Sequence, residues 1–143
     1  MADERSLKLE IVTPDGEVFH DDVAMVILCG VEGELGVMPR HQPLVTLLAI
    51  GETRVRRLDG TWEYIASGIG YGQVLFDRVL VVVDHGELAG AIDVARAEES
   101  QLRARERLQM RSDPAAQAEV DYFRADLALK RSENRLRVAG RSR

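Results

Sequence analysis

The chain has 143 residues, 45% of them hydrophobic and 30% charged, with a formal net charge of -5. This length suits one compact domain, or one domain with a small appendage. The acidic balance argues against nucleic-acid binding, which requires a basic surface. No apolar run approaches the roughly 20 residues that span a bilayer, and the polar residues 1–5 are not followed by the apolar segment of a signal peptide. We therefore expect a cytoplasmic protein that reaches a membrane only through a partner.

The composition changes along the chain. Residues 1–90 carry 7 Lys and Arg against 15 Asp and Glu, whereas residues 91–143 carry 12 against 9. The first part also holds 11 of the 12 glycines and three of the four prolines, the residues that separate short strands and turns. We expect two parts that differ in structure and in their surroundings. The only cysteine, Cys29, cannot form an internal disulfide and is expected to be a buried, inert thiol.

The first part is expected to be all β, because apolar and polar residues alternate in short runs bounded by turn residues. The predicted strands are Leu7–Val12, Val23–Cys29, Leu44–Leu48, Thr53–Leu58, Trp62–Ser67, Gln73–Phe76 and Val79–Val83. Leu7, Leu9 and Ile11 alternate with other residues and predict one buried face. The dipeptide Asp59-Gly60 predicts a hairpin. Many short, closely spaced strands indicate a sandwich or barrel.

The last third is rich in Ala, Arg, Glu and Leu, which predicts helices. Asp93 suits the positive end of a first helix. A second helix is predicted to begin at Pro114, with Asp113 as its N-cap, and to run to about Val138. Helical spacing predicts buried stripes made of Ile92, Ala95, Leu102 and Leu108 on the first helix, and of Val120, Phe123, Leu127, Leu129 and Leu136 on the second. Such thin stripes indicate an antiparallel hairpin with little core of its own.

The sequence carries no recognisable catalytic or metal motif. The glycine-rich run 68–72 follows a strand but leads into another strand, so it fails the test for a dinucleotide-binding loop. His20, His41 and His85 show no metal-ligand spacing, and no Ser, Cys or Lys has a recognised nucleophile setting. We expect no catalytic residue, no metal site and no required cofactor. A binding or mechanical role is favoured over an enzymatic one.

Three blocks along the chain resemble one family. Residues 11–19 read Ile-Val-Thr-Pro-Asp-Gly-Glu-Val-Phe, residues 32–44 read Glu-Gly-Glu-Leu-Gly-Val-Met-Pro-Arg-His-Gln-Pro-Leu, and residues 64–68 read Tyr-Ile-Ala-Ser-Gly, with Val74 shortly after. Their order and spacing resemble the epsilon subunit of bacterial rotary ATP synthases, and the second block is the most specific. The resemblance covers nearly the whole chain. One departure is Ile69, where many members have a second glycine, and it concerns only a local turn.

The resemblance implies an all-β sandwich of about ten strands in residues 1–88, followed by an antiparallel α-helical hairpin in residues 89–143. It implies a non-catalytic central-stalk subunit of the proton-transporting ATP synthase, peripheral on the cytoplasmic face of the bacterial inner membrane. The sandwich would contact the gamma subunit and the membrane c-subunit ring. The hairpin, when extended, would reach the alpha and beta subunits and inhibit ATP hydrolysis. Neither nucleic-acid binding nor membrane insertion is implied.

The resemblance also implies a contact with the membrane ring. Glu34 and His41 flank the second block, which the family places at the sandwich end facing the ring. The alternative is that the glycines and prolines only shape a turn and that both side chains face solvent.

A regulatory ATP site on the hairpin is the second implied site. The run Ile92-Asp93-x-x-Arg96-Ala97 resembles the signature of epsilon subunits that bind ATP. The matching residues are Glu87, Ile92, Asp93, Arg96, Ala97, Arg103, Arg131 and Arg135. Spacings of three, four and seven place the charged members on shared helix faces, and guanidinium groups suit phosphate. The alternative is a set of solvated helix charges.

Other readings stay open at this point. The basic stretch Arg103, Arg105, Arg107 and Arg111 is either a solvated face or a contact with acidic loops of the beta subunits. The chain as a whole could instead be a free-standing nucleotide-sensing module, or an enzyme with an unrecognised site on the sandwich.

Overall fold

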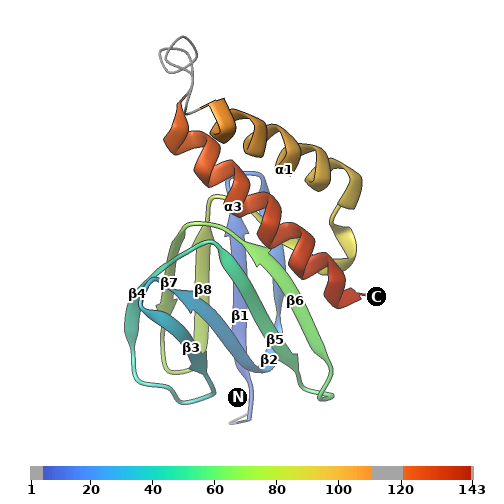
Figure 1. Cartoon of the computed structure of the whole chain (residues 1–143). Helices are drawn as coiled ribbons and strands as arrows, with labels where there is room; N and C mark the ends of the chain where they lie inside the picture. The colour runs from blue at the N-terminus through green and yellow to red at the C-terminus, as the bar shows by residue number, and fades with distance from the viewer. Residues whose placement is uncertain (1–4, 111–120, 143) are drawn as a thin grey trace. The chain divides into compact units, whose positions relative to one another are not determined.

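The computed structural model describes residues 5–110 and 121–142 and divides the chain into two compact units, of which the first ends at Ala89 and the second begins at Gly90. In the described residues the first unit is a sandwich of nine strands (Figure 1). The strands are β1 (Leu7–Thr13), β2 (Gly16–Gly30), β3 (Gly33–Val37), β4 (Leu44–Leu48), β5 (Gly51–Arg57), β6 (Trp62–Ser67), β7 (Gly70–Val74), β8 (Arg78–Val83) and β9 (Gly86–Leu88). Among the described residues, no helix is long and apolar enough to cross a membrane.

The long strand β2 belongs to both layers of the sandwich. Its first half pairs antiparallel with β1, and its second half pairs antiparallel with β3 on one side and β5 on the other. The pairing with β5 shifts register between Val23 and Met25, and such an irregularity bends a strand. From β2, the strand order continues through β5, β6 and β9 in one direction and through β4, β7, β8 and β1 in the other. The β1–β2 pairing therefore closes the sheet on itself.

Alternating apolar side chains form the core of the sandwich. The predicted inward residues Leu7, Leu9 and Ile11 are all buried, which confirms the predicted period of two along β1. They pack in one cluster with Phe19, Val23, Val26, Leu28, Val37, Leu48, Val55, Ile65, Val74, Val79, Val81 and Val83. Every strand except the short β9 contributes a buried side chain of this cluster, so the core holds the whole sheet together.

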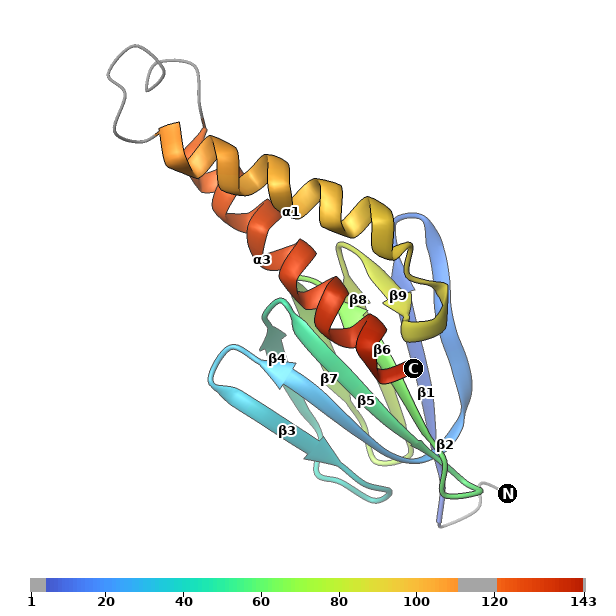
Figure 2. The ribbon, with the colours of Figure 1, turned by 45° about the vertical axis from the view of Figure 1, so that its right-hand side comes forward.

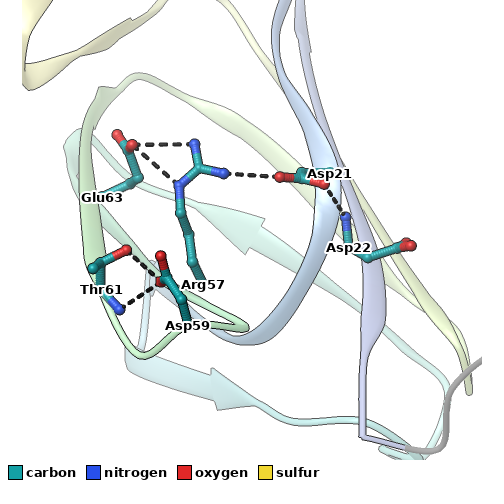
Figure 3. Close-up of polar contacts among 6 residues, drawn as sticks. All are labelled: Asp21, Asp22, Arg57, Asp59, Thr61 and Glu63. Atoms are coloured by element: carbon teal, nitrogen blue, oxygen red, sulfur yellow. Dashed lines mark hydrogen bonds and ion pairs between the residues drawn. The ribbon is translucent and has the colours of Figure 1, made fainter.

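Arg57 lies at one end of this core, and Figure 3 shows its polar contacts. It shares the inward face of β5 with Val55, and its guanidinium lies 5.2 Å from the centre of the Phe19 ring. Arg57 Nη1 donates to Asp21 on β2 at 2.8 Å, and its Nε and Nη2 donate to Glu63 on β6 at 3.2 and 3.1 Å. One cation thus joins β2, β5 and β6 at the edge of the apolar interior.

The turn between β5 and β6 confirms the hairpin predicted at Asp59-Gly60. Gly60 has a φ of 90°, a conformation that favours glycine. The Asp59 carboxylate accepts hydrogen bonds from the Thr61 hydroxyl at 2.6 Å and the Thr61 backbone N–H at 2.9 Å. These bonds stabilise the ionised form, so the pKa of Asp59 lies below its ordinary value of 3.8.

Several predicted strand limits differ from the observed ones. β4 and β6 have the predicted bounds, whereas β3, β9 and the first half of β2 were not predicted. β7 begins at Gly70, three residues before the predicted start.

Ile69 lies just before β7 with its side chain partly exposed, and its N–H donates to Asp84 Oδ1 at 3.0 Å, so the turn forms without a second glycine. Cys29 is only partly buried, because it lies on the outward side of β2, next to the buried Leu28.

The second unit holds helices α1 (Val94–Gln109) and α3 (Tyr122–Ala139), which lie side by side (Figures 1 and 2). Two 3-10 turns, Ala89–Ala91 and Gly140–Ser142, flank the pair. Asp93 is the N-cap of α1 and accepts the Arg96 N–H at 3.1 Å. Asp121 caps α3 in the same way. The cap predicted at Asp113 and the start predicted at Pro114 lie outside the described residues.

Small residues, not the predicted leucines, are buried along the helix pair. Ala97 and Ala104 on α1 are seven residues apart, as are Ala125, Ser132 and Ala139 on α3, and all five are buried. Equal spacing on two antiparallel helices lets the small residues face one another and the backbones approach closely. The predicted burial is therefore wrong for three members of the two stripes. Leu102 is 59% exposed, Phe123 is 72% exposed, and Ala95 is also exposed. Of the other predicted members, Ile92 is buried, Leu108, Leu127, Leu129 and Leu136 are half-buried, and Val120 lies outside the described residues.

The close packing can be tested at Ala104, which is 2% exposed. Ala104→Leu is expected to destabilise the helical unit by about 1–3 kcal/mol, because a larger side chain forces the helices apart. Glu106→Leu is the control, since Glu106 is exposed and receives the same side chain. Residue-level hydrogen exchange on α1 and α3 measures the effect. Equal protection in the two variants would contradict the small-residue interface.

The Asp59 turn predicts a pH dependence of stability. Because the pKa of Asp59 is lowered in the folded state, its contribution is present above the ordinary value of 3.8 and is lost as the pH falls through the folded pKa. We expect Asp59→Ala to have a lower melting temperature than the original chain at pH 7, with the difference shrinking below about pH 4. Asp77→Ala, at the turn between β7 and β8, is the control. A difference that stays constant across this range would argue against the assigned hydrogen bonds.

Candidate functional site

The outward face of β4 and β7 is apolar and exposed. Val45 and Leu47 on β4 are 68% and 64% exposed, although the next residue on the strand, Leu48, is buried in the core. Leu47 pairs across the strands with Tyr71 on β7, and both Tyr71 and the preceding Ile69 are partly exposed. A sheet that carries apolar residues on both faces usually has both faces covered. Among the described residues of the first unit, no element covers Val45 and Leu47.

The same face continues onto β8 and β1. Tyr71 pairs with Val82 and Gln73 with Leu80, while Val82 pairs in turn with Val12 on β1. Val82, Leu80 and Val12 are half-buried. We name the outward residues Val12, Val45, Leu47, Ile69, Tyr71, Leu80 and Val82 the β4–β7 face. This face was not predicted from the sequence. The pattern that indicates it is the run Leu44–Leu48, which has apolar residues at four of five positions, as expected for a strand with apolar residues on both faces.

Glu34 and His41, the predicted ring contacts, lie at opposite ends of β3. Glu34 is next to the turn between β2 and β3, and its carboxylate accepts a hydrogen bond from Arg54 at 2.7 Å. His41 lies beyond Val37, in the connection to β4, and its Nδ1 is 2.8 Å from the Gln42 carbonyl oxygen. At about 3.3 Å per residue, β3 alone separates them by roughly 10 Å. They are therefore two separate candidate contacts.

Three residues of the nucleotide-binding signature have structural roles on the helices. Ile92 and Ala97 are buried, and the Asp93 carboxylate caps α1. The exposed Arg96 and Arg103 are the members of α1 whose guanidinium groups remain accessible to a ligand, and Arg103 donates to the Ser100 hydroxyl at 3.3 Å. Burial explains the isoleucine and the alanine of the signature, and helix capping explains the aspartate. Neither role explains the two exposed arginines.

The other members of the predicted site lie on two different elements. Arg131 and Arg135 are half-buried on α3 and four residues apart, which places them on one helix face. Glu87 lies on β9 of the first unit, whereas the other seven residues belong to the second unit. Four arginines on two adjacent helices supply charge and hydrogen-bond donors of the kind that bind phosphate.

A histidine–aspartate pair connects two turns of the sandwich. His85 Nδ1 lies 2.8 Å from Asp84 Oδ1, and this oxygen also accepts the Ile69 N–H. The Gly68 N–H donates to the His85 carbonyl oxygen at 2.9 Å, and a side chain at Gly68 would collide with the imidazole. The pair fixes the β6–β7 turn against the β8–β9 turn. Within residues 5–110 and 121–142, no group of three or more His, Cys, Asp or Glu could hold a metal ion.

A closed β-sandwich with an uncovered apolar face, followed by a pair of capped helices, defines a two-unit class of protein built for contact with other chains. Two family models match this chain in that order. The model described as ATP synthase, Delta/Epsilon chain, beta-sandwich domain matches residues 6–89, and the long alpha-helix domain of the same chain matches residues 91–140. The chain belongs to the ATP synthase delta/epsilon chain family, and the resemblance found in the sequence is confirmed.

Curated relatives extend over nearly the whole chain. The ATP synthase epsilon chain of Halalkalibacterium halodurans is 43% identical and that of Bacillus velezensis 41%, each over 95% of this chain and 98% of the relative. The epsilon chain of Staphylococcus aureus strain JH9 is 42% identical over 94% of this chain and 96% of its own.

Solved structures share the fold at lower identity. A chain of the Euglena gracilis mitochondrial ATP synthase OSCP/F1/c-ring structure matches with a TM-score of 0.74 and 22% identity, over 91% of this chain and 79% of that chain. A chain of the Tetrahymena thermophila mitochondrial ATP synthase central stalk and c-ring matches with a TM-score of 0.53 and 13% identity, over 99% and 98%. At these identities the likeness describes the fold alone.

Proposed function

We propose that this chain is the non-catalytic epsilon subunit of a proton-transporting rotary ATP synthase, peripheral on the cytoplasmic face of the bacterial membrane, and that its sandwich joins the central stalk to the membrane ring. The observation that carries the proposal is the β4–β7 face. Its most exposed members, Val45 and Leu47, lie on a strand whose other side is buried in the core. Burial of such a face favours a complex, because apolar surface removed from water contributes about 25 cal/mol for each Å² before the costs of association are subtracted.

The gamma subunit is the partner that we assign to the β4–β7 face. The family membership supports a rotor location, as do the two structurally similar chains, which come from an OSCP/F1/c-ring assembly and from a central stalk with its c-ring. Contact of Glu34 or His41 with the membrane ring stays a prediction. Because the two residues lie at opposite ends of β3, one small ring loop would meet only one of them.

We also propose that the helical unit inhibits ATP hydrolysis when it extends toward the alpha and beta subunits. Leu102 and Phe123 support this role, because they are large apolar side chains exposed on α1 and α3. The second part of the chain carries 12 basic against 9 acidic residues, unlike the acidic sandwich. An exposed apolar and basic surface is suited to an acidic partner.

Regulatory ATP binding to the helical unit is the third part of the proposal. Arg96 and Arg103 on α1, together with Arg131 and Arg135 on α3, would hold the phosphates. If the arginines converge only when the helices lie side by side, ATP would favour that conformation, since a ligand shifts a balance through its differential affinity for the two states. High ATP would then hold the inhibitory extension back.

The docking face is tested by Leu47→Asp. A buried carboxylate at this position should weaken binding to the gamma subunit at least about tenfold, a change of about 1.4 kcal/mol. Leu58→Asp is the matched control, because Leu58 is 56% exposed but lies at the β5–β6 turn. Binding is measured by titration of purified gamma subunit with each variant. Equal affinities of the two variants would place the interface elsewhere.

The inhibitory role is tested by ending the chain after Gly90. The sandwich has its own core, so the shortened chain should still fold and join the complex. ATP hydrolysis by the complex should rise or lose its initial lag. The full chain in the same preparation is the control. A shortened chain that assembles without any change in hydrolysis would rule out inhibition by the helices, and failure to assemble would show that the second unit is not a separable regulator.

Nucleotide binding is tested by calorimetric titration of the full chain with ATP. We expect a dissociation constant in the millimolar range, equivalent to about 4 kcal/mol. The double variant Arg96→Ala with Arg131→Ala should lose binding. The double variant Arg107→Ala with Arg124→Ala is the control, since it removes two exposed arginines from the same helices. Unchanged affinity in the first variant would exclude the site as described.

A further inference from the structure

Arg40, in the connection between β3 and β4, has a backbone conformation that is unusual for an arginine. Among the described residues it is the one non-glycine residue with a positive φ, at 67°. Residues that carry a side chain are strained in this left-handed region, whereas glycine adopts it freely. Such strain persists only where the surrounding structure holds it, and it is found most often at functional sites. A glycine would fit this backbone better, so the arginine side chain itself needs a physical reason.

The turn between β7 and β8 holds Arg40 in this conformation. The Arg40 N–H donates to the Phe76 carbonyl oxygen at 3.0 Å, and the guanidinium lies 5.6 Å from the centre of the Phe76 ring. The turn itself is fixed, because the Leu75 N–H donates to the Arg78 carbonyl oxygen at 2.8 Å. The exposed side chain of Arg40 therefore has a defined place on an aromatic ring.

This turn forms one end of the β4–β7 face. Leu75 follows Tyr71 and Gln73 in the alternation along β7, so it lies on the outward side, where it is 37% exposed. Phe76 is 55% exposed in the turn. The outward surface that begins at Tyr71 thus continues to the ring on which Arg40 lies.

Cations gather at the same end of the face. Lys8 on β1 is in register with Arg78 on β8, and both are exposed on the side opposite the core. Asp77 Oδ1 lies 3.3 Å from Arg78 Nε, and Asp22 pairs with Lys8 from β2. With Arg40, three cations outnumber these two acidic residues, although residues 1–90 carry 7 basic against 15 acidic residues. A basic end on an acidic unit suits an acidic group of a partner.

We propose that Arg40 is a specificity-determining residue of the docking face and that it receives a carboxylate of the gamma subunit. The inference rests on the proposed function, in which that subunit covers the β4–β7 face. The partner would place an acidic side chain against the guanidinium and apolar side chains on Leu75 and Phe76, so that the ion pair forms beside a surface from which water is excluded. Because the turn fixes the arginine before binding, less side-chain freedom is lost on association.

Substitutions at Arg40 test the role of the guanidinium. Arg40→Gly removes the side chain and suits the backbone conformation, whereas Arg40→Lys keeps the charge but not the planar group. Purified gamma subunit is titrated with each full chain at low and at high salt. Arg40→Gly should bind at least tenfold more weakly than the original chain at low salt, and Arg40→Lys should lie between them. Added salt should weaken the original chain more than Arg40→Gly, because salt screens an ion pair.

Arg56→Ala is the matched control, since it removes an exposed cation from β5, which is not part of the β4–β7 face. It should bind like the original chain. The melting temperature of Arg40→Gly shows whether the variant is folded. Equal affinities of Arg40→Gly and the original chain would overturn the proposal. A weaker Arg40→Gly with an unchanged salt dependence would also overturn it, because Arg40 would then only shape the connection.

These outcomes differ from a failure of the proposed function. If Leu47→Asp weakens binding while Arg40→Gly does not, the gamma subunit still covers the β4–β7 face and only the role of Arg40 is rejected. Failure of the original chain to bind the gamma subunit would reject the proposed function and this inference together.

Discussion

The pairing of β2 with strands of both layers is the constraint on which the rest of the sandwich depends. Its first half aligns β1, and its second half aligns β3 and β5. Because those partners occupy both edges of the second half, β4 reaches β2 only at Gly30. Among the described residues, most of the β4 edge that faces away from β7 is therefore left without a strand partner. A strand that closes the core thus leaves one border of the sheet available for contact.

The sequence predicts a strand well where apolar alternation and turn residues agree. β4 and β6 have their predicted bounds, and the hairpin at Asp59-Gly60 forms as expected. The first half of β2 is missed because Asp21 interrupts the alternation between the buried Phe19 and Val23, and Arg57 pairs with Asp21 at the end of the core. β9 has only three residues, too few to show a period. Local sequence pattern does not predict a strand where a residue that is unfavourable in a strand is stabilised by a partner far away in the sequence.

The helices show a different limit. Hydrophobic periodicity gives the greatest weight to large side chains, and it selected Leu102 and Phe123, which are exposed. Most of the buried positions on the two helices are alanines and a serine, and the others are Asn134 and Val138 on α3. A spacing of seven shared by Ala97 with Ala104 and by Ser132 with Ala139 was present in the sequence. The same packing explains why the nucleotide-binding signature is less specific than it first looks: a buried alanine and a capping aspartate are needed by the helix itself.

The apolar residues on both sides of β4 have a consequence for the cell. Val45 and Leu47 are exposed in the isolated chain, and a copy without a neighbour presents them as an apolar surface to other proteins. Copies made in excess of that neighbour would expose an adhesive surface and become substrates for chaperones and proteases. Production of this chain in balance with its partner would keep that surface covered.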